Sequence, residues 1–232
     1  MTAEISVNGE RLLADADGAL IWPTRRTLIV ADLHLEKGSS YGRYGTFLPP
    51  YDSRTTLSRL TALTHRYSPR RIIALGDSFH DIEAPGRLAP DDRAALEALI
   101  HRHEWIWIAG NHDPVPPDEW GGTVLDEFTE GALVFRHAAA PGRAVGEVSG
   151  HFHPKAAVRV RGRLVSKRCF VCDGRRLILP SFGAYTGGLD VFDPAIASLL
   201  ERNFRVYMLG HRGVHALPRS GLRPSPHVGA AH

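Results

Sequence analysis

Three short segments of this chain are almost wholly apolar, and each runs directly into polar residues. They are residues 27–31, 71–75 and 105–109. Apolar runs of this length, rich in Ile and Leu, are typical of strands that are buried on both faces of a sheet. Helices are predicted between them, one from Asp52 to Ser68-Pro69 and one starting at Pro90. This alternation indicates a parallel sheet with crossover helices, in which ligands collect beyond the carboxyl ends of the strands.

The rest of the chain is expected to be rich in short strands. Asn8-Gly9 and Asp17-Gly18 predict hairpin turns near the N-terminus, and the polar residues 38–50 predict a loop. In the second half we predict strands at 124–128, 132–136, 146–149, 156–160, 164–171, 176–179 and 204–209, and a helix at 194–202. We expect a single α/β domain over residues 1–218, built from two packed sheets, and a disordered basic tail over residues 219–232.

The composition is that of an ordinary globular protein, with 43% hydrophobic and 23% charged residues in a chain of 232. This length suits one large domain with a sizeable core. No run of about 18 apolar residues occurs, and the first residues do not resemble a signal peptide. We therefore expect a cytoplasmic protein that does not enter a membrane.

The net charge is only +3, but the basic residues are unevenly placed. Between Lys155 and Arg176 there are eight Lys or Arg residues and one acidic residue, Asp173. Such a strip suits a polyanionic partner, because neutralising phosphates is the main non-specific contribution to nucleic-acid affinity. A solvated strand face followed by a basic tail explains the same pattern equally well.

The two cysteines, Cys169 and Cys172, form a C-x-x-C pair within a predicted strand. Such a pair can be redox-active or form half of a zinc site, but no second pair occurs. Residues three apart in a strand point to opposite faces, so we expect two reduced structural thiols.

Four polar motifs follow predicted strands, and all of their polar residues are common metal ligands. They are Asp32-Leu33-His34, Gly76-Asp77, Gly110-Asn111-His112-Asp113 and Gly150-His151-Phe152-His153, with a lone His137 between the third and the fourth. Carboxylate, amide and imidazole ligands of this kind suit a hydrolytic site with two divalent ions. In an extended stretch Asp32 and His34 would project the same way. His151 and His153 could serve one ion each or share one, and the spacing does not decide.

This series of motifs resembles the calcineurin-like binuclear metallophosphoesterases. The resemblance implies a four-layer αββα sandwich, with two mixed sheets flanked by helices, and two divalent metal ions. It implies that Asp32, His34, Asp77 and His153 hold the first metal, and that Asp77, Asn111, His137 and His151 hold the second. It also implies that His112 is catalytic, either stabilising the transition state or protonating the leaving oxygen, and that Asp113 lies behind the ligands.

One departure from the family pattern concerns the residue that orients His112. Many members read GDxxD, and the second Asp then binds the catalytic histidine. Here His80 takes that place and Asp81 follows one residue later. Either residue could orient His112, and the sequence does not decide between them.

Longer stretches resemble one branch of this family, the bacterial ligase-associated DNA damage response endonucleases (PdeM). These stretches are residues 31–41, 48–52, 76–81 and 179–189. The resemblance implies a manganese-dependent DNA endonuclease in DNA repair, linked to a DNA ligase and a helicase. We expect single-stranded or nicked DNA as the partner. The alternative is a phosphatase or a cyclic-nucleotide phosphodiesterase, because the same metal core serves both. A non-catalytic DNA-binding module is a third hypothesis, but it would not need His112 or two metal sites.

Overall fold

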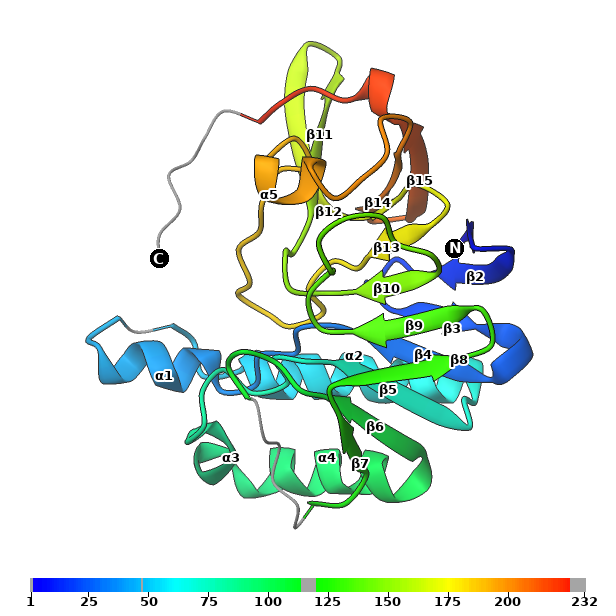
Figure 1. Cartoon of the computed structure of the whole chain (residues 1–232). Coiled ribbons are helices and arrows are strands. Elements are labelled where there is room, and N and C mark those ends of the chain that lie inside the picture. The colour runs from blue at the N-terminus through cyan, green and yellow to red at the C-terminus, as the bar shows by residue number, and fades with distance from the viewer. Residues whose placement is uncertain (1, 47, 114–119, 226–232) are drawn as a thin grey trace.

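The protein was analysed as a computed structural model, which describes residues 2–46, 48–113 and 120–225. Two sheets pack face to face (Figure 1). The first has seven strands in chain order: β1 (Ala3–Val7), β2 (Glu10–Ala14), β3 (Leu20–Trp22), β4 (Thr27–Val30), β5 (Arg71–Leu75), β6 (Glu104–Ile108) and β7 (Thr123–Leu125). Strands β4 to β7 are mutually parallel, whereas β1 to β4 pair antiparallel, so this sheet is mixed.

The second sheet has the strand order β15-β14-β12-β13-β10-β9-β8, with β11 paired to β12 outside this path. Its strands are β8 (Glu127–Glu130), β9 (Leu133–Arg136), β10 (Glu147–Ser149), β11 (Lys155–Val160), β12 (Arg163–Cys172), β13 (Arg176–Ile178), β14 (Arg205–Gly210) and β15 (Gly213–Pro218). Strands β9, β10 and β13 run parallel, and the other pairs are antiparallel. The predicted α/β class with two mixed sheets is therefore confirmed.

The helices lie outside the two sheets. They are α1 (Lys37–Arg43), α2 (Asp52–Tyr67), α3 (Ala84–Arg87), α4 (Pro90–Arg102) and α5 (Pro194–Ala197), with 3-10 turns η1 (Pro23–Arg25) and η3 (Arg219–Gly221). Leu60 of α2 and Leu96 of α4 are buried against the first sheet, in one cluster with Ile72 and Trp107. On the outer face of the second sheet, α5 is a single turn that buries Ile196. The predicted helix over 194–202 is therefore longer than the observed one.

The core between the sheets is apolar and takes residues from both. Ile29 and Ile73 of the first sheet pack in one cluster with Phe135 and Phe170 of the second. Burial of this area is the main favourable contribution to folding. It also holds the two sheets in one relative position, and the site described below depends on that position.

Three further predictions about secondary structure were wrong, and all three depend on tertiary contacts. The predicted loop 38–50 contains α1, because the Gly38 N–H donates to the buried Asp52 carboxylate at 2.9 Å. The predicted strand 124–128 is two strands, since β7 belongs to the first sheet and β8 to the second. Strands β14 and β15 form a hairpin, and the sequence prediction missed the second of them.

The predicted C-terminal tail is described only in part. Within that part, Leu222 is buried on the outer face of the second sheet, and the Arg223 N–H donates to the Ala157 carbonyl at 2.8 Å. Residues 226–232 of the predicted tail lie outside the described part of the chain. Within the described residues, no helix has both the length and the apolar character that a membrane span requires.

Both cysteines are buried and reduced. Cys169 packs on the outer face of the second sheet, and Cys172 packs in the core between the sheets. They point to opposite faces, as predicted.

Candidate metal centre

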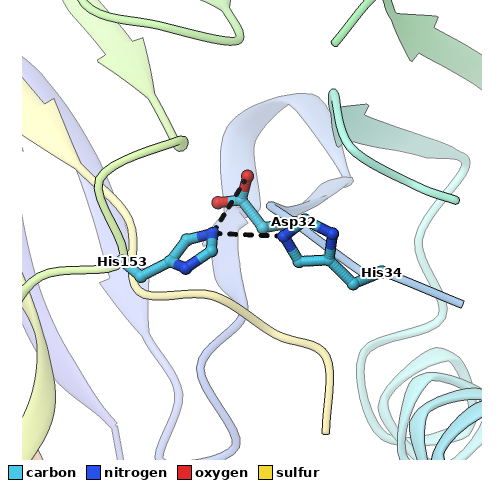
Figure 2. A group of neighbouring side chains, drawn as sticks. All are labelled: Asp32, His34 and His153. Carbon is cyan, nitrogen blue, oxygen red and sulfur yellow. Dashed lines mark hydrogen bonds and ion pairs between the residues drawn. The ribbon is translucent and has the colours of Figure 1, made fainter. Parts of the chain in front are cut away.

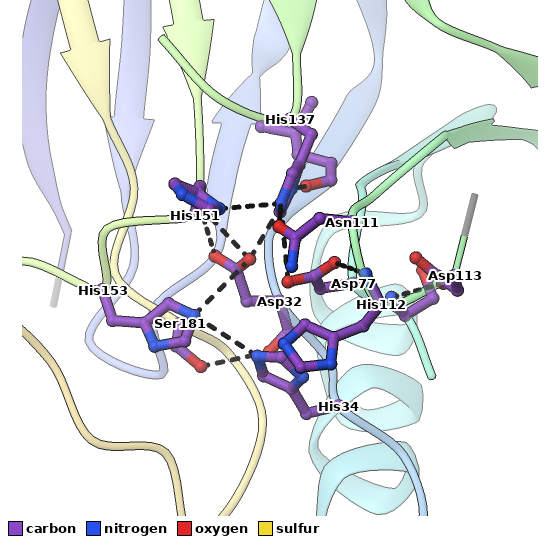
Figure 3. A network of polar contacts seen from close by, with 12 residues as sticks. Asp32, His34, Asp77, Asn111, His112, Asp113, His137, His151, His153 and Ser181 are labelled. Atoms are coloured by element: carbon purple, nitrogen blue, oxygen red, sulfur yellow. Dashed lines mark hydrogen bonds and ion pairs between the residues drawn. The ribbon is translucent and has the colours of Figure 1, made fainter. Parts of the chain in front are cut away.

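The polar motifs lie in loops that follow the carboxyl ends of strands in both sheets, and these loops meet at one place (Figure 3). From the first sheet, β4 leads to Asp32 and His34, β5 to Asp77, and β6 to Asn111 and His112; from the second, β9 leads to His137 and β10 to His151 and His153. The structure therefore brings together all seven residues for which metal binding was predicted. They form two clusters of side chains.

The first cluster consists of Asp32, His34 and His153 (Figure 2). The Nε2 atom of His153 lies 3.5 Å from Asp32 Oδ1 and 3.4 Å from His34 Nε2. Asp32 and His34 are buried. Two imidazole nitrogens and a carboxylate oxygen thus converge on one small volume.

The second cluster consists of Asp77, His137 and His151. The Nε2 atom of His137 lies 3.0 Å from His151 Nδ1 and 3.4 Å from Asp77 Oδ2. Asn111 joins this cluster, because its Oδ1 lies 2.9 Å from the same His137 nitrogen. His151 and His153 therefore lie in different clusters of side chains.

The donor and acceptor chemistry of the second cluster calls for a cation. The Nδ1 atom of His137 donates to the Leu75 carbonyl at 2.9 Å, so in the neutral ring Nε2 carries a lone pair and can only accept. That lone pair faces the Asn111 oxygen and the Asp77 carboxylate, which also accept. Such an arrangement is stable only with a proton or a metal ion between the acceptors. These residues therefore fit a divalent ion of the kind that oxygen and imidazole ligands bind.

The pKa values in the two clusters reflect the burial and close contacts of these side chains. Burial lowers the pKa of His137, but the hydrogen bond to Asp77 and the charges of Asp32 and Asp77 outweigh burial and raise it to about 9. Burial favours the protonated acid at Asp77, yet its contacts with His137 hold the pKa of Asp77 well below the usual range. Burial and the neighbouring His153 lower the pKa of His34. Burial and the charge of His137 lower the pKa of His151 in the second cluster, so the attraction for positive charge there is centred on His137.

The backbone at these positions is not extended, contrary to the prediction for Asp32 and His34. Five of the seven residues have positive φ: Asp32 (55°), His34 (43°), Asp77 (46°), His151 (70°) and His153 (48°). Left-handed backbone at a non-glycine residue costs about 1 kcal/mol or more and occurs where surrounding contacts enforce it. Here the loops after β4 and β5 hold each other, because the His34 N–H donates to the Asp77 carbonyl at 2.9 Å.

Glycines in two motifs leave room for neighbouring groups of the site. A Cβ atom on Gly110 would lie 2.2 Å from the Asp77 nitrogen and 2.3 Å from its Oδ1. A Cβ atom on Gly76, which has φ +72°, would lie 2.4 Å from His137 Nδ1. Any larger residue at either position would displace Asp77 or His137.

His112 is exposed beside the clusters, and the main chain holds its ring. Its Nδ1 donates to the His80 carbonyl at 2.8 Å, and the rings of His80 and His112 stack with centroids 5.2 Å apart. The Asp81 carboxylate instead accepts two hydrogen bonds from Arg87, at 2.7 and 2.9 Å. Neither side chain proposed to orient His112 therefore does so through a hydrogen bond.

Asp113 is buried next to the loop that carries Asp77. Its buried carboxylate accepts from the N–H groups of Ser78 and Phe79, at 2.7 and 3.1 Å, and so fixes the loop after Asp77. Burial raises the pKa of Asp113 to about 7. Burial and the charge of Lys37 lower the pKa of His80 to about 4.

The residues that hold the main chain of Asp32 in place were not predicted from the sequence. The Ser181 hydroxyl and the Gly183 N–H both donate to the Asp32 carbonyl, at 3.1 and 3.0 Å. Arg59 of α2 donates to the Phe182 carbonyl and stacks on the Phe182 ring at 4.4 Å. Arg59 lies within an ordinary helical pattern, so no sequence signal marks it.

Comparisons with known proteins reveal likenesses to solved structures. The crystal structure of the nuclease MPE from Pseudomonas putida shares 30% sequence identity, covers 94% of this chain and 100% of its own, and superposes with a TM-score of 0.72. YfcE, a phosphoesterase from E. coli, shares 12% identity, covers 82% of this chain and 97% of its own, and has a TM-score of 0.41. No family model and no curated protein sequence matches the chain.

Proposed function

Because the chain belongs to the calcineurin-like metallophosphoesterases, we propose that it is a DNA endonuclease that uses two divalent metal ions. The observation that carries this proposal is the pair of adjacent ligand clusters, in which acceptor atoms face one another. The family membership makes the chain a metal-dependent phosphodiesterase or nuclease. DNA as the substrate, manganese as the metal and a role in DNA repair are our proposals.

We assign the two metals to the clusters as follows. Asp32, His34, Asp77 and His153 would hold the first ion, and Asp77, Asn111, His137 and His151 would hold the second. When bound, the two ions would neutralise the phosphoryl oxygens and make a hydroxide nucleophile available near neutral pH. Manganese is the ion we expect, because the resemblance to the ligase-associated endonucleases implies it and carboxylate and amide oxygens suit it.

His112 would move a proton at its Nε2 atom. Its Nδ1–H is already bound to the His80 carbonyl, so Nε2 is the nitrogen left for the substrate. The protonated ring would donate from Nε2 to the leaving oxygen as the phosphorus–oxygen bond breaks. The stacked His80 ring and the fixed carbonyl would hold His112 at a constant angle.

Exposed tyrosines support DNA with unpaired bases as the substrate. Tyr44, Tyr51 and Tyr185 are 86%, 62% and 43% exposed. Tyr44 directly follows α1, whose Tyr41 ring lies 5.8 Å from that of His80, and Tyr185 follows the loop that supports Asp32. Aromatic rings of this kind stack on unpaired bases. Single-stranded or nicked DNA, and a functional link to a DNA ligase and a helicase, complete the proposal.

The deciding experiment compares three substrates with manganese present: a single-stranded DNA oligomer, an aryl phosphodiester and an aryl phosphomonoester. We expect cleavage of the oligomer and the diester, little turnover of the monoester, and loss of all activity with a chelator. Faster turnover of the monoester would indicate a phosphatase instead. Full activity after chelation, with no metal remaining in the protein, would refute the metal assignment.

A further inference from the structure

The β11–β12 hairpin extends beyond the second sheet, on the side away from the first sheet (Figure 1). Residues 169–172 of β12 pair with β14, whereas residues 163–168 pair only with β11. We call residues 155–168 the basic arm. Most of this arm is therefore not part of the sheet that supports the metal centre.

The basic arm carries six cations and no acidic residue: Lys155, Arg159, Arg161, Arg163, Lys167 and Arg168. Elsewhere arginines are commonly matched, as in the ion pairs of Arg66 with Asp15 and Arg87 with Asp81. Within the described part of the chain, no arm cation forms an ion pair with an acidic side chain. Arg159, Arg161, Arg163 and Lys167 are exposed. Two of the arm cations bind main-chain carbonyls instead, since Arg168 donates to Ser181 at 2.6 Å and Arg159 to Gly162 at 3.0 Å, so the positive charge of the arm is not neutralised.

Local stability does not explain the residues at the tip. The two-residue turn is Arg161–Gly162, and both residues have positive φ, 48° and 80°. Turns of this type favour Asn or Gly at the first position, because a Cβ atom there is unfavourable. An arginine at that position, flanked by Arg159 and Arg163, adds strain and mutual repulsion. A polyanionic ligand would offset both costs.

The arm begins beside the metal centre. Lys155 lies two residues after His153 of the first cluster, and six residues of each strand are paired. At about 3.3 Å per residue, the tip lies about 20 Å further along the hairpin. This length allows the arm to lie along several successive phosphates of a DNA strand that passes the metal centre.

From this juxtaposition we propose that the basic arm is a second DNA contact, which binds the sugar–phosphate backbone of the segment flanking the cleaved bond. The proposal rests on the DNA substrate proposed above. In this proposal the arm increases the affinity for DNA and takes no part in the cleavage step. Long substrates would therefore gain from the arm, and substrates too short to reach it would not.

The test replaces Arg159, Arg161 and Arg163 together by Ala and follows manganese-dependent cleavage against salt concentration. For a 30-nucleotide single strand we expect KM to rise at least tenfold with kcat unchanged. The slope of log(kcat/KM) against log[salt] should become shallower by about 2, because three phosphate contacts contribute about 0.7 each. Hydrolysis of an aryl phosphodiester and of a dinucleotide should not change.

Two control proteins make the result specific. The R11A/R70A/R102A variant removes three exposed arginines near the ends of first-sheet strands that point away from the metal centre. It should keep the salt slope of the unsubstituted protein. The R159K/R161K/R163K variant keeps the charge of the arm and should cleave the oligomer nearly normally. An arm-alanine variant with an unchanged KM and salt slope would overturn the proposal. If the unsubstituted protein hydrolyses the aryl diester but not DNA, the DNA substrate itself is wrong and the arm proposal falls with it.

Discussion

The two ligand clusters draw on the two sheets in different proportions. The first cluster takes Asp32 and His34 from the first sheet and only His153 from the second. The second cluster takes Asp77 and Asn111 from the first sheet and two residues, His137 and His151, from the second. Neither sheet alone provides every ligand that we assign to either ion. The metal centre therefore depends on the packing between the sheets.

The clusters also differ in how firmly their histidines are held. The ring of His137 is fixed by the Leu75 carbonyl, and the pKa of His137 is raised by Asp77 and Asp32. His34 is equally buried, but its Nδ1 atom has no hydrogen-bond partner in the described structure, and its pKa is lowered. The second cluster is thus prepared for a cation by hydrogen bonds and charge, whereas the first depends more on the ion itself.

The largest expected effect comes from Asp77, which we assign to both metals. Asp77→Ala should lower diester hydrolysis by about a thousandfold, equivalent to about 4 kcal/mol, because both ions lose a ligand. The measurement is steady-state hydrolysis of an aryl phosphodiester with manganese. Asp81→Asn is the matched control, since Asp81 binds Arg87 and belongs to neither cluster. Equal activities of the two variants would contradict the idea of a shared ligand.

The second-largest expected effect concerns a buried ion pair within the second sheet, away from the proposed metal ligands. Glu147 and Arg176 form a buried ion pair at 2.6 Å on the neighbouring strands β10 and β13. Glu147→Gln leaves the buried guanidinium without a counter-charge and should destabilise the protein by about 3 kcal/mol.

Chemical unfolding of the metal-free protein measures this loss. Glu127→Gln is the control, because the Glu127–Arg136 pair is more exposed and should contribute less than about 1 kcal/mol. A loss of the same size in both variants would show that burial of the pair does not matter.

A third pair of variants separates the two clusters directly. His34→Ala and His137→Ala should each bind one manganese ion instead of two and lose about a hundredfold in activity. The remaining ion should bind more tightly in His34→Ala, because the better prepared second cluster is then intact. Metal titration by calorimetry gives both the stoichiometry and the affinity. Equal affinities in the two variants would remove the distinction between the clusters.

The smallest expected effect concerns the thiols. Burial raises the pKa of Cys169 above its usual range and that of Cys172 to about 12, so at pH 8 both remain protonated. Iodoacetamide should therefore modify neither cysteine in the folded protein and both after denaturation, as mass spectrometry would detect. Rapid modification of Cys172 would mean that the two sheets separate readily, since Cys172 faces the core between them.

Much of the first sheet could be predicted from the sequence, because its signals are local. A strand buried on both faces needs a continuous apolar run, so β4, β5 and β6 were found together with the motifs that follow them. The boundary between β7 and β8 was missed, because the chain leaves one sheet for the other within a few residues and no glycine or proline marks the change. Helix α1 was missed for a similar reason, as its N-terminus is held by Asp52, which is distant in sequence.

The sequence by itself determined which residues supply the chemistry. Ligand types depend only on side-chain identity, and the order of the motifs could be read without coordinates. The tertiary structure decided how those residues are divided between two clusters. His151 and His153 both have left-handed backbone, and their side chains lie in different clusters, which their spacing in the sequence does not reveal. It also decided that a main-chain carbonyl of His80, and neither candidate side chain, holds His112. Every residue has such a carbonyl, so only folding can reveal which one is used.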